Sequence, residues 1–161
     1  MRFVVSKPAD QIAAFVASRL GAGSRSWGDF KAIALVDEDR IYAGVVYNYY
    51  TGTNVCMHVG ALSGRHWLTP EFLFAGFDYP FRVMGVRRVT GLVPSKNWEA
   101  RRFDEALGFV YEGTMRDALA DDDMLVYGML KGECKWISSE FCGKLQRRLL
   151  RRTPASQLAS A

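Results

Sequence analysis

The stretch from Asn97 to Leu130, NWEARRFDEALGFVYEGTMRDALADDDMLVYGML, predicts a helix followed by two strands. Asn97 is a favourable N-cap, because its side-chain oxygen can accept from the free amides of a first helical turn. Apolar residues then recur at helical spacing on one face, at Trp98, Phe103, Ala106 and Leu107. Gly108 stands where a helix commonly ends in a left-handed residue. Two β-rich runs follow, and residues 121–123 are predicted to form the turn between them.

Four short motifs in this stretch carry a family resemblance. They are Asn-x-x-Ala from Asn97, Leu-Gly-Phe at 107–109, Glu-Gly-x-x-Arg from Glu112 to Arg116, and Tyr-Gly-Met-Leu at 127–130. In this order they resemble the C-terminal half of GNAT acyltransferases, in particular the branch that contains ribosomal-protein N-terminal acetyltransferases. The resemblance implies transfer of an acetyl group from acetyl-CoA to a primary amine. The acceptor would be a protein N-terminus or a small-molecule amine, and no metal is expected.

The rest of the chain fits the element order of that family. Asp10 is predicted to cap a first helix, Thr69 a second one that Pro80 shortens, because proline removes one intrahelical donor. Strands are predicted at 31–36, 40–49, 55–62 and 88–93. We therefore expect an α/β (α+β) fold, the GNAT acyl-CoA N-acyltransferase fold, with a central mixed and mostly antiparallel sheet flanked by helices. The ligand cleft is expected between the strands at 55–62 and 88–93.

Composition bounds the class of protein. A chain of 161 residues that is 49% hydrophobic and 24% charged is typical of one globular domain. No apolar run reaches the ~18 residues that span a bilayer, and the N-terminus shows no signal-peptide pattern, so no membrane partner is expected. The three cysteines lack Cys-x-x-Cys spacing, which favours reduced thiols over a metal site. The expected compartment is the cytoplasm, and the expected assembly is a monomer or homodimer.

The net charge of +4 comes from the end of the chain. Residues 137–161 contain one acid, Glu140, and five cations: Lys144, Arg147, Arg148, Arg151 and Arg152. Residues 1–136 are therefore formally neutral and are predicted to be the acetyltransferase domain. Residues 137–161 are predicted to be a basic amphipathic helix and tail, with apolar residues every fourth position from Ile137 to Leu149. Either this helix packs on the domain, or it docks an acidic protein or RNA.

The resemblance also implies a coenzyme site. The strand end at Gly60, Ala61 and Leu62 would lie beside the pantetheine arm. The loop that follows would meet the pyrophosphate through Gly64, Arg65, His66, Trp67 and Thr69, because exposed amides at a helix start bind phosphate. Asn97 would contact the coenzyme arm. Leu68 and Pro70 depart from the pattern, since the family prefers small residues there.

The catalytic groups are less completely specified. His58 is the only histidine in the strand before the coenzyme loop, and an imidazole with a pKa near 6.5 suits a general base. Many GNAT enzymes place a tyrosine acid seven residues after the asparagine, where this chain has Asp104. Because an ionised carboxylate is a poor proton donor at neutral pH, the sequence assigns no acid. Glu112 and Arg116 are interpreted as a fold signature, with an ion pair between them and a place in the lining of the acceptor pocket as alternatives.

Two other functions fit the same sequence. One is a catalytically silent module of this fold that binds acyl-CoA. The other is a nucleic-acid-associated or ribosome-associated protein that acts through its basic tail.

Overall fold

The structure is a computed structural model that describes residues 1–21, 26–38, 40–64 and 66–152. Its strands are β1 Phe3–Val5, β2 Phe30–Val36, β3 Ile41–Asn48, β4 Asn54–Ala61, β5 Arg88–Pro94, β6 Val110–Leu119 and β7 Asp122–Leu130. Its α-helices are α1 Ala9–Arg19, α2 Pro70–Asp78, α3 Trp98–Leu107 and α4 Ser139–Arg152. A π-helical turn, η1 Tyr79–Val83, extends α2, and two 3-10 turns, η2 Lys131–Glu133 and η3 Lys135–Ile137, precede α4.

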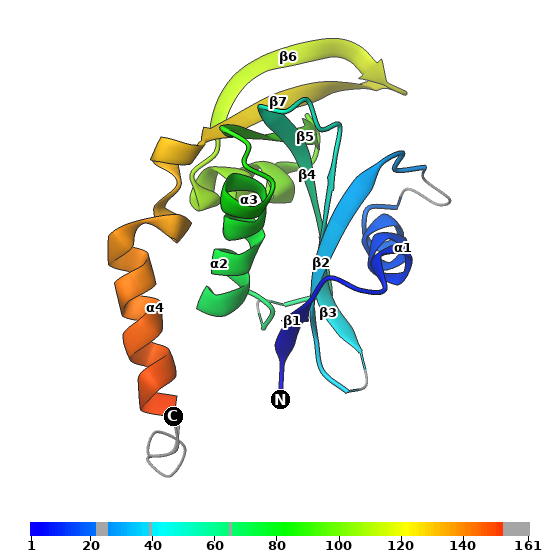
Figure 1. Cartoon of the computed structure of the whole chain (residues 1–161). Helices are drawn as coiled ribbons and strands as arrows, with labels where there is room; N and C mark the ends of the chain where they lie inside the picture. Colours follow the sequence, from blue (N-terminus) through cyan, green and yellow to red (C-terminus); the bar gives the residue numbers. More distant parts are fainter. Residues whose placement is uncertain (22–25, 39, 65, 153–161) are drawn as a thin grey trace.

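All seven strands form one sheet in the order β1-β2-β3-β4-β5-β7-β6. Every neighbouring pair is antiparallel except β4 and β5, which run parallel. Helix α1 covers one face of the sheet, α2 and α3 cover the other, and α4 lies outside α2 (Figure 1). The predicted mixed and mostly antiparallel sheet flanked by helices is confirmed. Among the described helices, none is long and apolar enough to cross a membrane.

The sheet opens between its two parallel strands. β4 and β5 pair at three positions, Asn54 with Arg88, Val55 with Val89 and Cys56 with Thr90. Beyond them β4 continues along β3 as far as Ala61, while β5 continues along β7 as far as Pro94. The two strands are therefore held by different neighbours and part after Thr90. This opening lies between the two strands that the sequence predicted would border the cleft.

Helix α1 approaches the sheet closely over two facing glycines. Gly44 of β3 is the register partner of Gly60 of β4. A Cβ added at Gly60 would lie 2.8 Å from the Cα of Val16, and one at Gly44 would lie 2.8 Å from the Val16 side chain. No other residue type fits there without moving the helix. The buried face of α1 packs against this part of the sheet as a separate small core, with Ile12 and Val16 at its centre.

The predicted ends of α2 and α3 are confirmed. Thr69 caps α2 by accepting from the Phe72 amide at 3.1 Å, and Asn97 caps α3 by accepting from the Ala100 amide at 3.1 Å. Gly108 ends α3 with φ 110°. Pro80 lies at the second residue of the π-helical turn that follows α2, so the regular helix does stop before it.

Three local predictions are wrong. Asp10 does not cap α1, because the extended residue Pro8 is the N-cap and Asp10 lies within the first turn. The β6–β7 turn is tighter than predicted, since Leu119 pairs with Asp122 and Asp121 adopts φ 58°. Trp98 is 64% exposed rather than on the buried face of α3, and the Arg101 guanidinium lies over its ring at 4.1 Å.

Helix α4 packs on the domain beside α2. Ile137 and Leu145 are buried, and Phe141 meets Trp136 edge to face with ring centroids 5.4 Å apart. The Arg148 Nε lies 3.2 Å from a Glu71 carboxylate oxygen. The Ser138 hydroxyl accepts from the Phe141 amide at 3.2 Å and so caps the start of α4. The apolar edge of the tail helix thus contributes to the fold as far as Leu145.

We expect Leu145→Ala to lower the free energy of unfolding by about 2 kcal/mol, because it removes a buried side chain between α4 and the domain. Leu150→Ala is the matched control, because Leu150 is 52% exposed on the same helix, and its effect should stay within about 0.5 kcal/mol. Urea denaturation of both variants measures the difference. Equal effects would mean that α4 does not pack as described.

Candidate active site

The open edge of β4 presents backbone groups toward the gap. On the β3 side, the Leu62 amide donates to the Tyr42 carbonyl at 2.9 Å, and on the β5 side the Thr53 carbonyl accepts from the Arg88 amide at 3.1 Å. Because successive residues of a strand point their amides to alternate sides, the amides of Val59 and Ala61 face the gap. Both lie beyond the last β4–β5 pair. The structure therefore places hydrogen-bond donors on an unpaired strand edge.

The three residues predicted to lie beside pantetheine differ in orientation. Ala61 directs its backbone into the gap, whereas Gly60 pairs with β3 and faces α1. Leu62 points its amide to β3 as well. Of the three, Ala61 has the geometry for a backbone hydrogen bond to a ligand in the gap. Residue 60 is a glycine because α1 packs closely against it. Coenzyme contact by Gly60 and Leu62 stays a prediction.

The loop between β4 and α2 has fewer free donors than a good phosphate cradle. Pro70 has no amide hydrogen, the Phe72 amide donates to the Thr69 hydroxyl, and the Leu73 amide donates to the Thr69 carbonyl at 2.9 Å. Glu71 adds an acidic side chain to the same turn. The departure from the family pattern at Pro70 therefore removes a backbone donor that a phosphate could use. The start of α2 by itself is a poor anion site.

The remaining loop residues are placed as follows. Gly64 adopts φ 87°, and the His66 carbonyl accepts from the Arg2 guanidinium at 2.8 Å. The Thr69 amide donates to the Trp67 carbonyl at 2.8 Å. Arg65, the predicted phosphate ligand, lies outside the described residues. Phosphate binding by this loop stays a prediction.

Aromatic side chains close the space between α2 and α3 above β4. The Trp67 ring lies 5.5 Å from the Phe103 ring, centroid to centroid, so the loop before α2 touches α3. Beneath them a cavity of about 20 Å³ is lined by Met57 and Val59 of β4 and by side chains of both helices. That is room for about one water molecule. A longer ligand entering here has to displace Trp67 or Phe103.

Asn97 lies at the α3 end that begins just after β5. Its side-chain oxygen is used as the helix cap, and its side-chain amide group still carries two N–H donors. Capping and ligand contact are therefore compatible, and the coenzyme contact of Asn97 stays a prediction.

Asp104 lies under α3 against β5. A Cβ added at Gly91 would lie 3.0 Å from its Oδ2 atom, so the glycine leaves the room that the carboxyl group occupies. Burial, together with the negative charge of the neighbouring Glu105, raises the pKa of Asp104 to about 7. Both effects favour the protonated form of the Asp104 carboxyl group relative to an aspartate in water. A carboxyl group with a pKa of about 7 is half protonated at neutral pH and can donate a proton.

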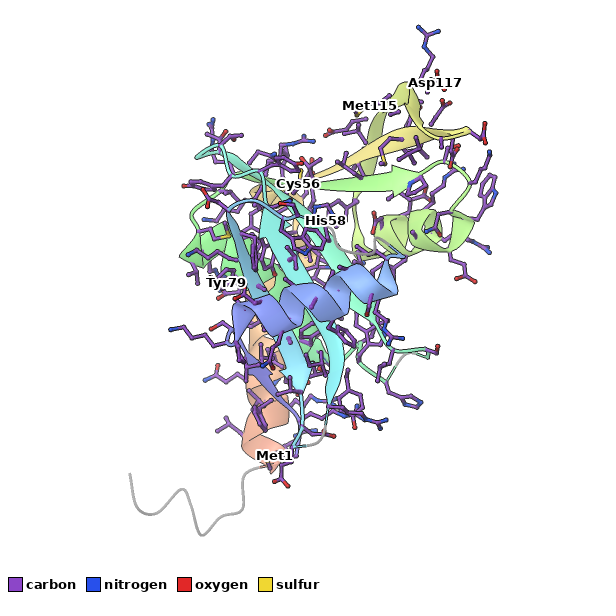
Figure 2. The ribbon with its side chains drawn as sticks, turned by 90° about the vertical axis from the view of Figure 1, so that its right-hand side faces the viewer. Met1, Cys56, His58, Tyr79, Met115 and Asp117 are labelled. Atoms are coloured by element: carbon purple, nitrogen blue, oxygen red, sulfur yellow. The ribbon has the colours of Figure 1, made fainter. Side chains whose placement is uncertain are left out.

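His58 lies on the opposite face of the sheet from Met57 and Val59. Its Nε2 atom lies 2.9 Å from the Asn48 Oδ1 atom, and its ring centroid lies 5.1 Å from that of Trp27. The side chain is buried on the α1 side, close to Cys56 on the same strand (Figure 2). Its role as a general base stays a prediction, and an acceptor amine would have to reach it from the α1 side.

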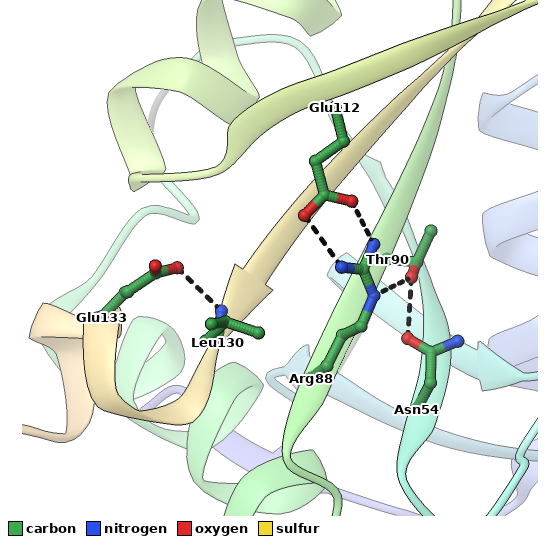
Figure 3. A network of polar contacts seen from close by, with 6 residues as sticks. All are labelled: Asn54, Arg88, Thr90, Glu112, Leu130 and Glu133. Atoms are coloured by element: carbon green, nitrogen blue, oxygen red, sulfur yellow. Dashed lines mark hydrogen bonds and ion pairs between the residues drawn. The ribbon is translucent and has the colours of Figure 1, made fainter.

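A polar network lies on the same face of the sheet as His58 and was not predicted from the sequence. Glu112 binds the Arg88 guanidinium with two hydrogen bonds of 2.8 and 2.5 Å, so the predicted alternative of a Glu112–Arg116 pair is wrong (Figure 3). Arg88 also donates to the Thr90 hydroxyl at 3.2 Å. The Arg88 guanidinium lowers the pKa of Glu112. A Cβ at Gly128 would lie 2.3 Å from Glu112 Oε1, so this glycine in Tyr-Gly-Met-Leu was the available signal.

Comparisons with known proteins agree on the fold. No family model matches the chain, and no curated protein matches it in sequence. A mutant of spermidine N-acetyltransferase SpeG from Vibrio cholerae aligns with a TM-score of 0.69 at 12% identity, covering 86% of this chain and 98% of the other. Ribosomal-protein-S5-alanine acetyltransferase from Vibrio fischeri aligns with a TM-score of 0.61 at 14% identity, covering 85% and 96%. A putative acetyltransferase aligns with a TM-score of 0.61 at 19% identity, covering 82% and 84%.

The structural neighbours and the parted parallel strands define one class. The chain has the fold of the GNAT acetyltransferases, as the motifs between Asn97 and Leu130 predicted. At these identities the likeness concerns the fold, and the chemistry has to be argued from the residues of this chain.

The raised pKa of Asp104 predicts a pH-dependent stability. A carboxyl whose folded-state pKa lies above its unfolded value costs stability as pH rises from about 4 to about 7, and the cost is constant above that. We expect Asp104→Asn to gain about 1–3 kcal/mol in free energy of unfolding, relative to the unchanged protein, between pH 4 and pH 8.

Asp122 supplies the matched control for this measurement. The Ser95 hydroxyl donates to its carboxylate at 2.6 Å and lowers its pKa, so Asp122→Asn should be less stable than the unchanged protein across pH 4 to pH 8, with a difference that shrinks only at lower pH. Denaturant titrations at each pH give both comparisons. A pH-independent difference for Asp104→Asn would refute the raised pKa.

Proposed function

We propose that the protein is an N-acetyltransferase that transfers an acetyl group from acetyl-CoA to a primary amine. The observation that carries the proposal is the unpaired edge of β4, where the amides of Val59 and Ala61 face the gap left by β5. An extended amide-rich chain such as pantetheine can bond to such an edge as a further strand would. The gap is the position where this fold can hold a thioester against fixed donors.

The reaction follows from that placement. An amide of β4 donates to the thioester carbonyl oxygen, and the bond strengthens as negative charge develops on the oxygen. The amine nitrogen attacks the carbonyl carbon and loses a proton to a base. The carbon–sulfur bond then breaks and its electron pair goes to sulfur, which takes up a proton from solvent, so the products are the N-acetyl amine and the free thiol of coenzyme A. Positioning of the two reactants supplies much of the rate.

Binding of the coenzyme requires a rearrangement of side chains. The cavity of about 20 Å³ under Trp67 and Phe103 is far smaller than a pantetheine arm, so these two rings have to part. Asn97, at the start of α3, is close to the open end of β5 and offers two donors to the arm. The pyrophosphate is proposed to meet the loop that contains Gly64, Arg65 and His66.

The acceptor is proposed to be a small-molecule amine or a protein N-terminus. The structural neighbours are named for spermidine and for an alanine of a ribosomal protein, both of which present amino groups. On this chain the buried His58 and the Arg88–Glu112 pair lie on the face opposite to α2 and α3. An amine approaching from the α1 side would meet them.

A second candidate is a silent module that binds acyl-CoA. The shortage of donors at the start of α2 and the contact between Trp67 and Phe103 favour it. The two functions separate in one assay. Release of free thiol from acetyl-CoA on addition of spermidine or of a peptide with N-terminal alanine supports the enzyme. Calorimetric binding of acetyl-CoA with no thiol release from any amine of a broader panel supports the module.

Val59→Pro tests the backbone donor. Proline removes the amide while keeping a side chain of similar size, and this amide is not needed for pairing with β3. We expect a loss of roughly 100-fold or more in kcat with the fold retained by circular dichroism. Val59→Ala is the matched control, because it keeps the amide, and should stay near normal. Equal turnover of the two variants would exclude the Val59 amide as the oxyanion donor.

His58→Ala tests the predicted base. If His58 takes the amine proton, the variant should lose roughly 100-fold in kcat and the acidic limb of the pH–rate profile should disappear. Asn48→Ala removes the partner of its Nε2 atom and should move that limb without abolishing turnover. An unchanged pH–rate profile in His58→Ala would assign the histidine to packing against Trp27.

A further inference from the structure

The tail helix α4 reaches the start of α2. The Arg148 Nε donates to a Glu71 carboxylate oxygen at 3.2 Å, and Glu71 lies in the first turn of α2. The motifs that resemble the GNAT family end at Leu130, so α4 lies outside them. The contact therefore joins a helix that the family resemblance does not cover to the end of the loop that is proposed to meet the pyrophosphate.

This contact changes the charge at the start of α2. The first turn of a helix attracts anions, because the aligned backbone dipoles leave a partial positive charge there. The Glu71 carboxylate opposes that attraction, and the Arg148 guanidinium offsets the carboxylate. The two side chains are 49% and 27% exposed, so the pair borders solvent and a ligand can approach it. A cation from the tail thus compensates the group that makes the start of α2 unfavourable for phosphate.

The Arg148 guanidinium keeps donors for a ligand. A guanidinium carries five N–H groups, and the bond to Glu71 uses the one at Nε. Within the described part of the chain, the four N–H groups on its two terminal nitrogens have no hydrogen-bond partner. This planar fork matches the spacing of two phosphate oxygens.

A second guanidinium holds the other end of the same loop. Arg2 precedes β1, donates to the His66 carbonyl at 2.8 Å and lies over the Tyr42 ring, 3.8 Å from its centroid. The N-terminus and the end of α4 lie at the same end of the molecule (Figure 1, Figure 2). The segment from His66 to Glu71 therefore runs between an arginine of the N-terminal arm and an arginine of the tail helix.

We propose that Arg148 and Arg2 bind the phosphate groups of coenzyme A at the segment from His66 to Glu71. The inference rests on the proposed binding of acetyl-CoA. Backbone amides at a helix start bind phosphate in many proteins, but here Pro70 has no amide hydrogen and Thr69 occupies the next two donors. Guanidinium groups from both ends of the chain replace those amides. The tail helix is then a part of the coenzyme site.

Calorimetry with coenzyme A gives the first test. Arg148→Ala should weaken binding roughly 10-fold, because it removes charge-assisted bonds to phosphate. Arg147→Ala is the matched control, because it removes the same charge from the neighbouring exposed position, and it should change the affinity less than about 2-fold. Equal affinities of these two variants overturn the role of Arg148. Arg2→Ala should also weaken binding roughly 10-fold, and normal affinity overturns the role of Arg2.

The variant Glu71→Gln separates phosphate binding from anchoring of the tail helix. If Arg148 only anchored α4, loss of either member of the ion pair would weaken coenzyme binding equally. If Arg148 binds phosphate, Glu71→Gln removes a repelling charge and releases the guanidinium. Coenzyme A should then bind at least as tightly as to the unchanged protein. A loss of affinity in Glu71→Gln equal to that in Arg148→Ala overturns the proposal.

Inorganic pyrophosphate, followed by phosphorus NMR, separates failure of the site from failure of the proposed function. If pyrophosphate binds in an Arg148-dependent way and coenzyme A does not bind, the acetyl-CoA function fails and the anion site stands. If coenzyme A binds equally to the unchanged protein, Arg148→Ala and Arg2→Ala, the function stands and the site fails. If neither ligand binds, both fail.

A single-stranded RNA tests the competing use of the same cations. Salt-sensitive RNA binding that falls equally in Arg147→Ala and Arg148→Ala, with coenzyme affinity unchanged in both, would make α4 a nucleic-acid surface and overturn the proposal. Loss of coenzyme affinity in Arg148→Ala alone is the expected result.

Discussion

The structure depends on the separation of two parallel strands whose backbones are each held on one side only. β4 pairs with β3 from Cys56 to Ala61 and β5 pairs with β7 from Arg88 to Pro94, whereas β4 and β5 pair with one another at only three positions. An unpaired strand edge inside a protein is costly unless something else satisfies its donors and acceptors. Here the edge is not covered by a helix, because α2 and α3 pack on the face of the sheet rather than in its plane (Figure 1). The sheet is therefore incomplete between β4 and β5. An extended ligand can take up the unpaired positions there.

Glycines on three strands fix the groups around this opening. Gly60 lets the backbone of α1 approach within van der Waals contact, which anchors β4 from one face. Gly91 leaves the space in which the Asp104 carboxyl lies on the other face, and Gly128 leaves the space for the Glu112 carboxylate that binds Arg88. None of the three has a positive φ. All three positions need glycine because another group comes close to the strand, not because of turn geometry. At Gly91 and Gly128 that group is an ionisable carboxyl group. A substitution with alanine would therefore change the position of a charge as well as the packing.

The sequence was informative where the physics is local. Caps such as Asn97 and Thr69 involve residues three positions apart, and Gly108 needs only its own φ, so these could be predicted from the chain. The Arg88–Glu112 pair joins residues 24 positions apart and requires the strand register, which no local pattern contains. The same holds for Asp104, whose acidity depends on Gly91 in another element and on burial under α3. The exposed Trp98 shows the limit of helical periodicity, because an aromatic ring can instead lie under a guanidinium at the surface.

The two faces of the sheet divide the chemistry that the proposed reaction needs. Strand alternation places His58 and Thr90 on the α1 side, whereas Val59 and Gly91 direct their Cα substituents toward α2 and α3. A carbonyl held in the gap by β4 amides has one open side toward each face. In the proposed reaction, an amine that arrives on the α1 side would meet His58 there. The parted strands would therefore hold the thioester of the proposed reaction between the two faces, with His58 on the α1 side and the apolar side chains of α2 and α3 on the other.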